Sequence, residues 1–219
     1  MSDSINRSRD LLIWGASGHA LVVADAVRCG GRLNIAGFID DVNPGRAGES
    51  FGGSRIIGGR DVIKDLQSSG VVWAFAAVGD NAARVELGQV LRDAGFRLPV
   101  IVHPRAIVAD AIVLGDRTYV AAGCVICPEA HIGRSVIVNT AATVDHHCLI
   151  GEGAHVAPGA HLAGWVSVGE QALIGVGASV RDRIRIGARA VIGAGAAVVT
   201  DIPAGTTACG VPARVREDQ

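Results

Sequence analysis

An aliphatic residue recurs at every sixth position of the second half of the chain, without interruption from Val102 to Val198. A period of six matches neither the 3.6-residue repeat of a free helix nor the two-residue alternation of an ordinary strand. It is typical of a solenoid, in which each six-residue unit forms one short face and points its aliphatic residue inward. The pattern therefore predicts a repeat domain over residues 103–219. The recurring residues are Val102, Val108, Leu114, Val120, Ile126, Ile132, Val138, Val144, Ile150, Val156, Leu162, Val168, Ile174, Val180, Ile186, Ile192 and Val198.

The same hexads carry glycine and small residues at fixed places. Glycine often follows the aliphatic residue, as at Gly133 and Gly151, and a small residue usually stands four positions after it, as at Ala142 and Cys148. We expect the small residues to permit tight corners and the glycines to supply backbone angles that other residues resist. Three hexads would then complete one triangular coil.

Composition limits the partners and the compartment. The net charge of −1 gives no sign of binding to nucleic acid or to an anionic membrane. No apolar run reaches the roughly 20 residues that a membrane span needs. The five cysteines are odd in number and no secretory segment is recognisable, which favours the cytoplasm. Cys124 and Cys127 form a lone C-x-x-C, and a zinc site would need two more matched ligands, so packing is the better interpretation.

Strand and helix patterns alternate before the repeats, which predicts a small Rossmann-like α/β domain over residues 10–102. Residues 1–9 are polar and are expected to be disordered. A glycine-rich loop is expected after the second strand, and Asn81 is expected to cap the third helix. The predicted elements are strands at 11–14, 34–39, 71–78 and 98–102, and helices at 20–29, 61–68 and 81–94.

Three loops of this domain are expected at one edge of its sheet. They are Gly15–His19 between the first strand and helix, Asp40–Asp41 after the second strand and Gly79–Asn81 after the third. Free N–H groups at a helix start attract phosphate, and ligands bind outside the carboxyl ends of parallel strands. The first loop lacks the dinucleotide fingerprint G-x-G-x-x-G. The alternative is that the loops are ordinary tight turns, but their shared edge favours a ligand site.

Reactive side chains in the solenoid concentrate in the segment 139–148, which contains Asp145, His146 and His147. A histidine titrates near neutral pH and can accept the proton of an attacking amine or hydroxyl. Metal binding is the competing use. His155 and His161 lie one hexad apart, so they fall on different faces of a coil. They could share an ion only across a subunit interface, as in hexapeptide-repeat carbonic anhydrases.

The chain after residue 10 resembles the NeuD/PglD-like family of hexapeptide-repeat sugar acetyltransferases, in particular its bacterial N-acetyltransferase branch. The combination of motifs in this order is specific, although no single motif is. The motifs are Gly15-Ala16-Ser17-Gly18-His19, Phe38-Ile39-Asp40-Asp41, Val78-Gly79-Asp80-Asn81, Asn139-Thr140, Asp145-His146-His147-Cys148 and Gly210-Val211-Pro212-Ala213-Arg214.

The resemblance implies a left-handed parallel β-helix, a homotrimer, and acetyl-CoA in the groove between neighbouring subunits. It implies that His146 is the catalytic base and that Asn139 lies near this base and the sugar. It assigns the nucleotide sugar to Ser17, Gly18, His19, Asp40, Asp41 and Gly79, and acetyl-CoA to His155, Val176 and Ala194.

One residue departs from the family pattern. In this branch an acidic residue follows the catalytic histidine, whereas His147 stands there in this chain. Asp145 could supply the carboxylate, because alternate residues of a strand share a face. The other reading is that the base works with a weaker partner.

Together these features predict a cytoplasmic, acetyl-CoA-dependent N-acetyltransferase without a metal, acting directly on the amine of a nucleotide-linked 4-amino-dideoxy sugar. UDP is the favoured nucleotide. One alternative on the same fold is O-acetylation of sialic acid or a related sugar. Alternatives of other classes are a metal-dependent hydratase on a hexapeptide-repeat scaffold and a non-catalytic nucleotide-sugar sensor.

Overall fold

The computed structural model describes residues 9–216, which divide into two compact units between Ile101 and Val102. Most of the tail expected to be disordered, residues 1–8, lies outside the described range. Arg9 is held to the first unit, because its guanidinium donates to the carbonyl oxygens of Gly31 (2.5 Å) and Arg32 (2.7 Å).

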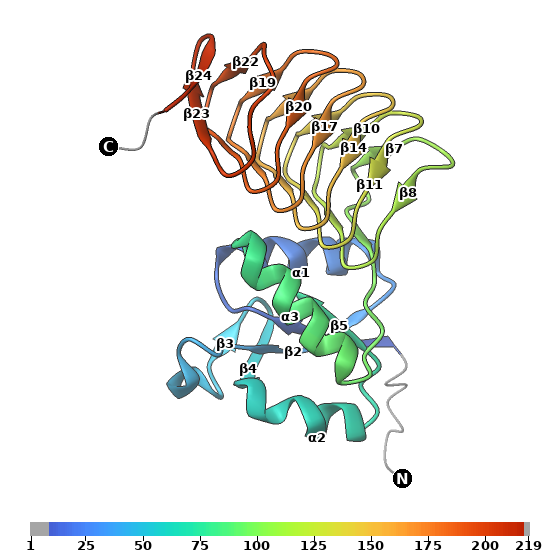
Figure 1. Cartoon of the computed structure of the whole chain (residues 1–219). Helices are drawn as coiled ribbons and strands as arrows, with labels where there is room; N and C mark the ends of the chain where they lie inside the picture. The colour runs from blue at the N-terminus through green and yellow to red at the C-terminus, as the bar shows by residue number, and fades with distance from the viewer. Residues whose placement is uncertain (1–8, 217–219) are drawn as a thin grey trace. The chain divides into compact units, whose positions relative to one another are not determined.

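The first unit is an α/β domain built on a five-stranded sheet (Figure 1). The strand order is β3-β4-β2-β1-β5, and all neighbours are parallel except the β3–β4 hairpin. The strands are β1 (Asp10–Trp14), β2 (Asn34–Ile39), β3 (Ser50–Phe51), β4 (Ser54–Gly58) and β5 (Trp73–Ala76). The helices are α1 (Gly18–Gly30), α2 (Ile63–Ser68) and α3 (Asn81–Asp93), with 3-10 turns η2 (Pro44–Arg46) and η3 (Arg60–Val62).

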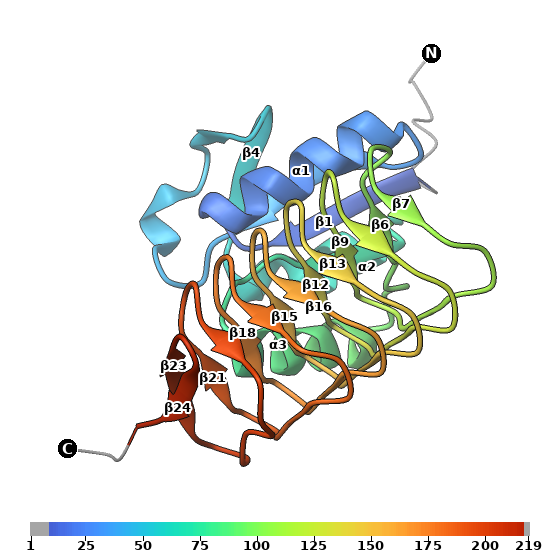
Figure 2. The same ribbon diagram turned by 90° about the horizontal axis from the view of Figure 1, so that it is seen from above.

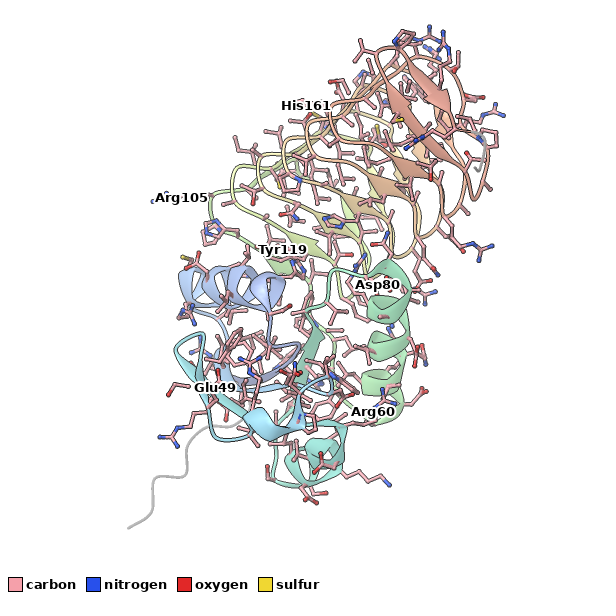
Figure 3. The ribbon with its side chains drawn as sticks, turned by 90° about the vertical axis from the view of Figure 1, so that its left-hand side faces the viewer. Glu49, Arg60, Asp80, Arg105, Tyr119 and His161 are labelled. Atoms are coloured by element: carbon pink, nitrogen blue, oxygen red, sulfur yellow. The ribbon has the colours of Figure 1, made fainter. Side chains whose placement is uncertain are left out.

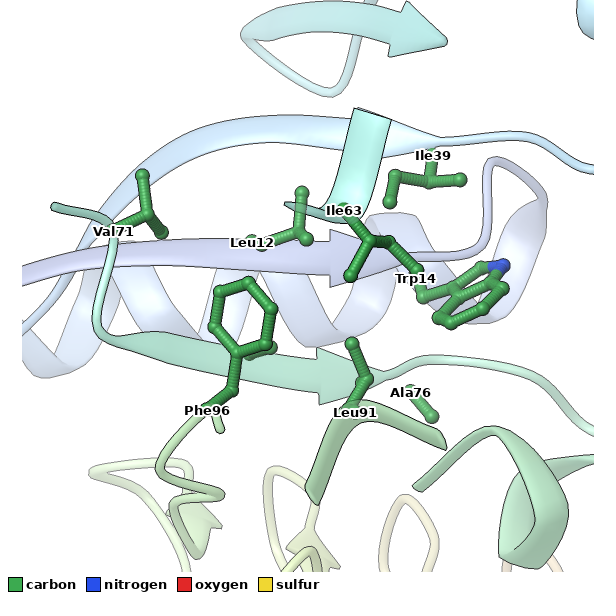
Figure 4. Packing of buried hydrophobic residues seen from close by; sticks show 9 residues of the cluster. Leu12, Trp14, Ile39, Ile63, Val71, Ala76, Leu91 and Phe96 are labelled. Carbon is green, nitrogen blue, oxygen red and sulfur yellow. The ribbon is translucent and has the colours of Figure 1, made fainter. Parts of the chain in front are cut away.

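Apolar residues cover both faces of this sheet. Leu12 and Trp14 of β1 pack on one face with Ile63 of α2, Leu91 of α3 and Phe96 (Figure 4). Helix α1 lies on the other face, as the same view shows. Burial on both faces explains why β1 reads as a continuous apolar run in place of an alternating one.

Three local predictions for this unit are wrong. Residues 98–102 form no return strand: Arg97 makes an isolated bridge with Trp73, and Ile101–Val102 is instead the first strand of the solenoid. The glycine-rich segment after β2 contains the β3–β4 hairpin. The cap of α3 is Asp80, whose carboxylate accepts from the N–H of Ala83 at 2.8 Å, because Asn81 already has helical backbone.

The second unit is a left-handed parallel β-helix (Figures 1 and 2). From β6 to β19, each two-residue strand pairs in parallel with the strand 18 residues later, as Val125 does with Thr143, so three hexads form one coil. The strands are β6 (Ile101–Val102), β7 (Ile107–Val108), β8 (Val113–Leu114), β9 (Tyr119–Val120), β10 (Val125–Ile126), β11 (His131–Ile132), β12 (Ile137–Val138), β13 (Thr143–Val144), β14 (Leu149–Ile150), β15 (His155–Val156), β16 (His161–Leu162), β17 (Ser167–Val168), β18 (Leu173–Ile174), β19 (Ser179–Val180), β20 (Arg185–Ile186), β21 (Val191–Ile192) and β22 (Ala197–Val198).

These strands form three sheets, one on each side of the coil. The eight-stranded solenoid sheet runs from β6 through β9, β12, β15, β18 and β21 and ends in β23 (Thr207–Gly210) and β24 (Ala213–Val215). The six-stranded solenoid sheet runs from β7 to β22 and the five-stranded solenoid sheet from β8 to β20. No helix in residues 9–216 has the length and apolar character required to cross a membrane.

The interior of the coil follows the sequence pattern. From Val120 to Val198 every periodic aliphatic residue is at most 3% exposed, whereas Val102 at the start of the solenoid is 37% exposed. The small residues four positions later are buried as well, as at Ala142 and Cys148. They fill the corners from inside, where a larger side chain would not fit.

The expectation for the glycines that follow the aliphatic residue is wrong. These glycines do not have a positive φ; a Cβ on Gly151 would instead lie 2.6 Å from the backbone nitrogen of Glu170 in the next coil. The left-handed conformation occurs two residues further on, at the corner, where many residues other than glycine adopt it. Non-glycine examples are Ala111, Arg117, Glu129, Ser135, Ala141, His147, Trp165, Gln171, Arg183 and Arg189.

Candidate functional site

A cavity of about 490 Å³ opens at the carboxyl ends of β1 and β2 in the first unit. Ser17, Asp40 and Asp41 line it, as expected from the sequence. Gly18, His19 and Gly79 are not among its lining residues, although Val78 of the third loop is. The Ser17 side chain caps no N–H group of α1, so the helix start keeps its capacity for an anion.

Asp40 holds the loops of this cavity together. One carboxylate oxygen accepts from the N–H groups of Val42 (3.1 Å) and Asn43 (3.0 Å), and the other pairs with Arg46 at 2.8 Å. Burial alone would raise the pKa of Asp40, but these hydrogen bonds outweigh it and leave the pKa below its ordinary value. Because both oxygens are engaged, Asp40 is suited to shaping the cavity and less suited to holding ribose hydroxyls.

Arg46 extends this network across the cavity wall. It also donates to the carbonyl of Ala16 at 3.0 Å and forms a two-point ion pair with Glu49, with both contacts at 2.9 Å. It thereby ties the loop after β1 to the loop after β2. No pattern in the sequence marks Arg46 as a residue of this site.

Asp41 is the more available carboxylate. Its side chain is 27% exposed and lies 3.3 Å from Nε of Arg60, whose guanidinium sits 5.3 Å from the ring centroid of Trp14. Arg60 and Glu49 are both labelled in Figure 3. A partly exposed carboxylate beside a cation and an indole provides partners for a polar, planar ligand group.

Arg84 binds the backbone of the loop 78–81, a role that no pattern in the sequence indicates. This buried guanidinium donates to the carbonyls of Val78 (3.2 Å), Gly79 (3.1 Å) and Asp80 (3.3 Å). Burial lowers the pKa of Arg84 to about 10. Burial, followed by the charge of Arg84, lowers the pKa of His19 to about 4, so His19 is neutral at pH 7.

In the second unit, His146 and His147 form a pair at the corner that follows β13. Their Nδ1 atoms lie 3.1 Å apart, and the rings meet edge to face with centroids 5.2 Å apart. Asp145, the other partner considered for His146, accepts from the backbone N–H of His146 at 2.6 Å. The ring of His146 therefore has an imidazole as its hydrogen-bond partner at Nδ1.

Two residues of the following coil lie against this pair. The indole of Trp165 stacks on His147, with centroids 4.0 Å apart and planes 18° apart. A Cβ on the buried Gly164 would lie 2.6 Å from Cε1 of His146, so the ring occupies the space that a side chain there would need. The guanidinium of Arg183 lies over the same indole, 5.6 Å from the ring centroid.

The remaining predicted residues lie on other parts of the coil. Nδ2 of Asn139 is 3.1 Å from Nε2 of His155, both on the eight-stranded solenoid sheet or its corner. Val176 and Ala194 follow strands β18 and β21 of that sheet and are exposed. His161 projects from the six-stranded solenoid sheet (Figure 3), where its Nδ1 lies 3.0 Å from Oγ1 of Thr143.

Comparisons with known proteins identify the family. Residues 10–91 match the family model of the PglD N-terminal domain. A GDP-perosamine N-acetyltransferase of Escherichia coli O157:H7 is 31% identical over 182 residues, which span 81% of this chain and 80% of that protein. The chain belongs to the NeuD/PglD-like family of acetyl-CoA-dependent sugar acetyltransferases.

Solved structures of members of this family superpose closely. PerB of Caulobacter crescentus, in complex with CoA and GDP-perosamine, has a TM-score of 0.91 and 39% identity, covering 95% of this chain and 97% of that one. A variant of the same protein with a histidine replaced by asparagine holds the same ligands. The acetyltransferase domain of PglB from Neisseria gonorrhoeae FA1090, in complex with acetyl coenzyme A, has a TM-score of 0.89 and 38% identity, covering 95% and 99%.

A simple rule could have found the residues of this acetyltransferase that the sequence analysis missed at the histidine corner. Adding 18, the length of one coil, to His146 and His147 gives Gly164 and Trp165. Arg183 follows from one more coil. Arg46 and Arg84 gave no such signal, because their partners are mostly backbone carbonyls and loop carboxylates.

Proposed function

We propose that this protein transfers the acetyl group of acetyl-CoA to the amine of a nucleotide-linked 4-amino-dideoxy sugar, with His146 as the general base. The main support is the imidazole pair at the corner of the β-helix, of which His146 is exposed, in a chain whose relatives include sugar N-acetyltransferases. O-acetylation of sialic acid is the second candidate on the same fold. The relatives named above favour an amine as acceptor.

The imidazole pair fixes which nitrogen of His146 can act. Since two ring nitrogens share the 3.1 Å contact, one must donate and the other accept. With the proton on Nδ1 of His146 and the lone pair on Nδ1 of His147, Nε2 of His146 carries a lone pair for the substrate. We assign this tautomer because a general base needs that lone pair.

Transfer then proceeds in a ternary complex. The neutral amine attacks the thioester carbonyl while Nε2 of His146 takes one amine proton. The tetrahedral intermediate collapses, the amide forms, and the CoA thiolate leaves and takes up a proton. Holding both substrates in place supplies much of the rate enhancement, because it removes the entropic cost of their meeting.

We propose a homotrimer, because the candidate residues fall at different corners of one protomer. His146 follows a strand of the six-stranded solenoid sheet, whereas Val176 and Ala194 follow strands of the eight-stranded solenoid sheet. A neighbouring copy can place one corner beside the other. Measurement of the molar mass in solution, with and without acetyl-CoA, tests this; a monomer that turns over acetyl-CoA would contradict it.

A guanosine nucleotide is the first candidate for the acceptor, ahead of the UDP that the sequence analysis favours. Its support is the pair of relatives described with GDP-perosamine. The decisive experiment is a thiol-release assay with acetyl-CoA and a panel of GDP-, UDP- and dTDP-linked 4-amino sugars. Activity with free sialic acid alone would favour the O-acetyltransferase, and activity with none of these acceptors would contradict the proposal.

We place the reaction in the cytoplasm, where acetyl-CoA and nucleotide sugars are made. The five free cysteines fit a reducing compartment. The product would serve glycan assembly.

Arg46 offers a test of the first unit. Replacing Arg46 by methionine should raise KM for the nucleotide sugar roughly 10- to 100-fold, because loss of hydrogen bonds to charged partners costs about 1.5–3 kcal/mol. The buried Asp40 would lose its ion pair, and the loops after β1 and β2 would lose the side chain that connects them. Steady-state kinetics should show little change in kcat. Arg97→Met, at a cation that only covers Trp73, is the matched control; equal effects of both changes would contradict this role.

A further inference from the structure

We infer that Gly164 and Trp165 form a two-residue seat that holds the imidazoles of His146 and His147 in their working arrangement. Both are positioning residues, and neither needs to touch a substrate. The inference rests on the proposed role of His146 as the base. Four observations carry it: the coil register, the absent Cβ of Gly164, the stacking of Trp165, and the contact between the two imidazoles.

The register of the β-helix aligns the two pairs. One coil is 18 residues long, so Gly164 follows His146 and Trp165 follows His147 in the next coil. The backbone N–H of Trp165 donates to the carbonyl of His146 at 3.0 Å, which fixes the separation of the coils at this corner. The side chains of the two coils are therefore brought within contact distance of one another at this corner.

The need for glycine at 164 arises from His146 and not from the backbone. Gly164 is not among the residues with a positive φ. The equivalent position of other hexads carries alanine at Ala122, Ala188 and Ala194. The three atoms nearest to a Cβ at Gly164 all belong to the ring of His146, at 2.6, 2.7 and 3.2 Å. A single methyl group would therefore push the ring aside while the coil could retain its path.

Trp165 fixes the second ring. Its indole lies nearly parallel to the imidazole of His147, and the guanidinium of Arg183 lies over the indole, 5.6 Å from its centroid. With the plane of His147 fixed, its Nδ1 stays directed at Nδ1 of His146. Around this pair lie the carboxylate of Asp145, which binds the His146 backbone, and the thiol of Cys127, which contacts Asp145. Among these contacts, the stacked indole of Trp165 is the one that lies against the plane of the His147 ring.

Loss of the indole should therefore act on the base through the tautomer of His146. If His147 turns away, Nδ1 of His146 loses its acceptor, and the proton can move to Nε2, where the lone pair is needed. A misplaced catalytic group costs on the order of 10²-fold in rate. We expect Trp165→Gly to lower kcat by about 10- to 100-fold with little change in KM for either substrate.

Trp165→Gly is suited to this test because it should still fold. Trp165 has a φ of 64°, a conformation that glycine adopts without strain, and glycine occupies the same hexad position at Gly159 and Gly177. Trp165→Phe retains an aromatic ring for stacking and should recover most of kcat. Gly164→Ala should lower kcat to a similar extent at an unchanged melting temperature. Wild-type kcat in both Trp165→Gly and Gly164→Ala would overturn the inference.

Nitrogen NMR of histidine-labelled protein provides a readout that does not depend on turnover. The wild type should show His146 protonated at Nδ1, assigned by the loss of its signals in His146→Ala, and Trp165→Gly should show a mixture of tautomers. An unchanged His146 signal in Trp165→Gly would overturn the inference. The same spectra separate this inference from the proposed function. If the protein has no acetyltransferase activity but the tautomer of His146 still depends on Trp165, only the proposed function is refuted.

A double-mutant cycle distinguishes positioning from direct contact with a substrate. If Trp165 acts through His147, the change Trp165→Gly should have no further effect on kcat in a His147→Gly background. A loss of equal size in both backgrounds would show that the indole contacts a substrate, and would overturn the assignment as a positioning residue.

Discussion

Replacing His146 by alanine is expected to lower kcat by about 10²–10⁴-fold, the usual contribution of a positioned general base. The amine would lose the group that removes its proton, and Nδ1 of His147 would lose its partner. KM should change little, because binding of the nucleotide sugar is proposed to depend mainly on the first unit. Thiol release at saturating concentrations of both substrates measures the effect.

The control for this change is another histidine of the same scaffold. His161 projects from a strand and contacts Thr143, and no step of the proposed mechanism uses it. His161→Ala should retain kcat within about twofold. Because His146 and His161 are both exposed, both variants should melt close to the wild type. Equal activity of His146→Ala and the wild type would remove His146 from the mechanism.

The hydrogen-bond partner of the His146 ring could not be predicted from the sequence, although the fold around it could. The period of six predicts the coil and its buried aliphatic residues, because burial repeats with the backbone. It also makes His146 a candidate by contrast with an otherwise unreactive scaffold. The partner of His146 is less accessible to such reasoning: Asp145 and His147 are both adjacent in sequence, and only the three-dimensional contact selects the His147 ring.

The first unit shows a related limit. The three loops at one sheet edge were predictable, since parallel strands end on the same side. Which groups are engaged within those loops was not. The sequence predicts Asp40 as a ligand-binding carboxylate, yet both its oxygens accept hydrogen bonds from Arg46 and backbone N–H groups. Arg46 and Arg84 belong to no recognisable motif, so the sequence does not indicate which groups they bind.

The handedness of the solenoid had to come from the family resemblance. A period fixes the number of residues per face, but a parallel crossover is right-handed by default, and nothing in the repeat reverses that rule. The role of the glycines that follow the aliphatic residues is hidden from the sequence for a similar reason. A glycine in a sequence suggests an unusual backbone conformation at that residue. Here glycine is required because the backbone of the next coil leaves no room for a Cβ, and the sequence does not show that contact.

That requirement can be measured by comparing two glycine-to-alanine changes. Gly151→Ala should destabilise the protein by about 3–5 kcal/mol, because its Cβ would lie 2.6 Å from a backbone nitrogen and 2.8 Å from a backbone carbon of the next coil. Neither atom can move without separating the coils, and the hydrogen bond from Gly151 N–H to the Val168 carbonyl at 2.8 Å would be strained.

Gly159→Ala is the matched change, at a corner with a φ of 65° and nothing within 4 Å of the added methyl group. It should cost only the roughly 1–2 kcal/mol of a left-handed residue. Urea unfolding of the three proteins, followed by circular dichroism, gives the difference. If Gly159→Ala lowers the free energy of unfolding more than Gly151→Ala does, backbone conformation determines where this solenoid requires glycine. The reverse order would show that close contact between coils sets where glycine is required, and so where side chains such as His146 can be accommodated.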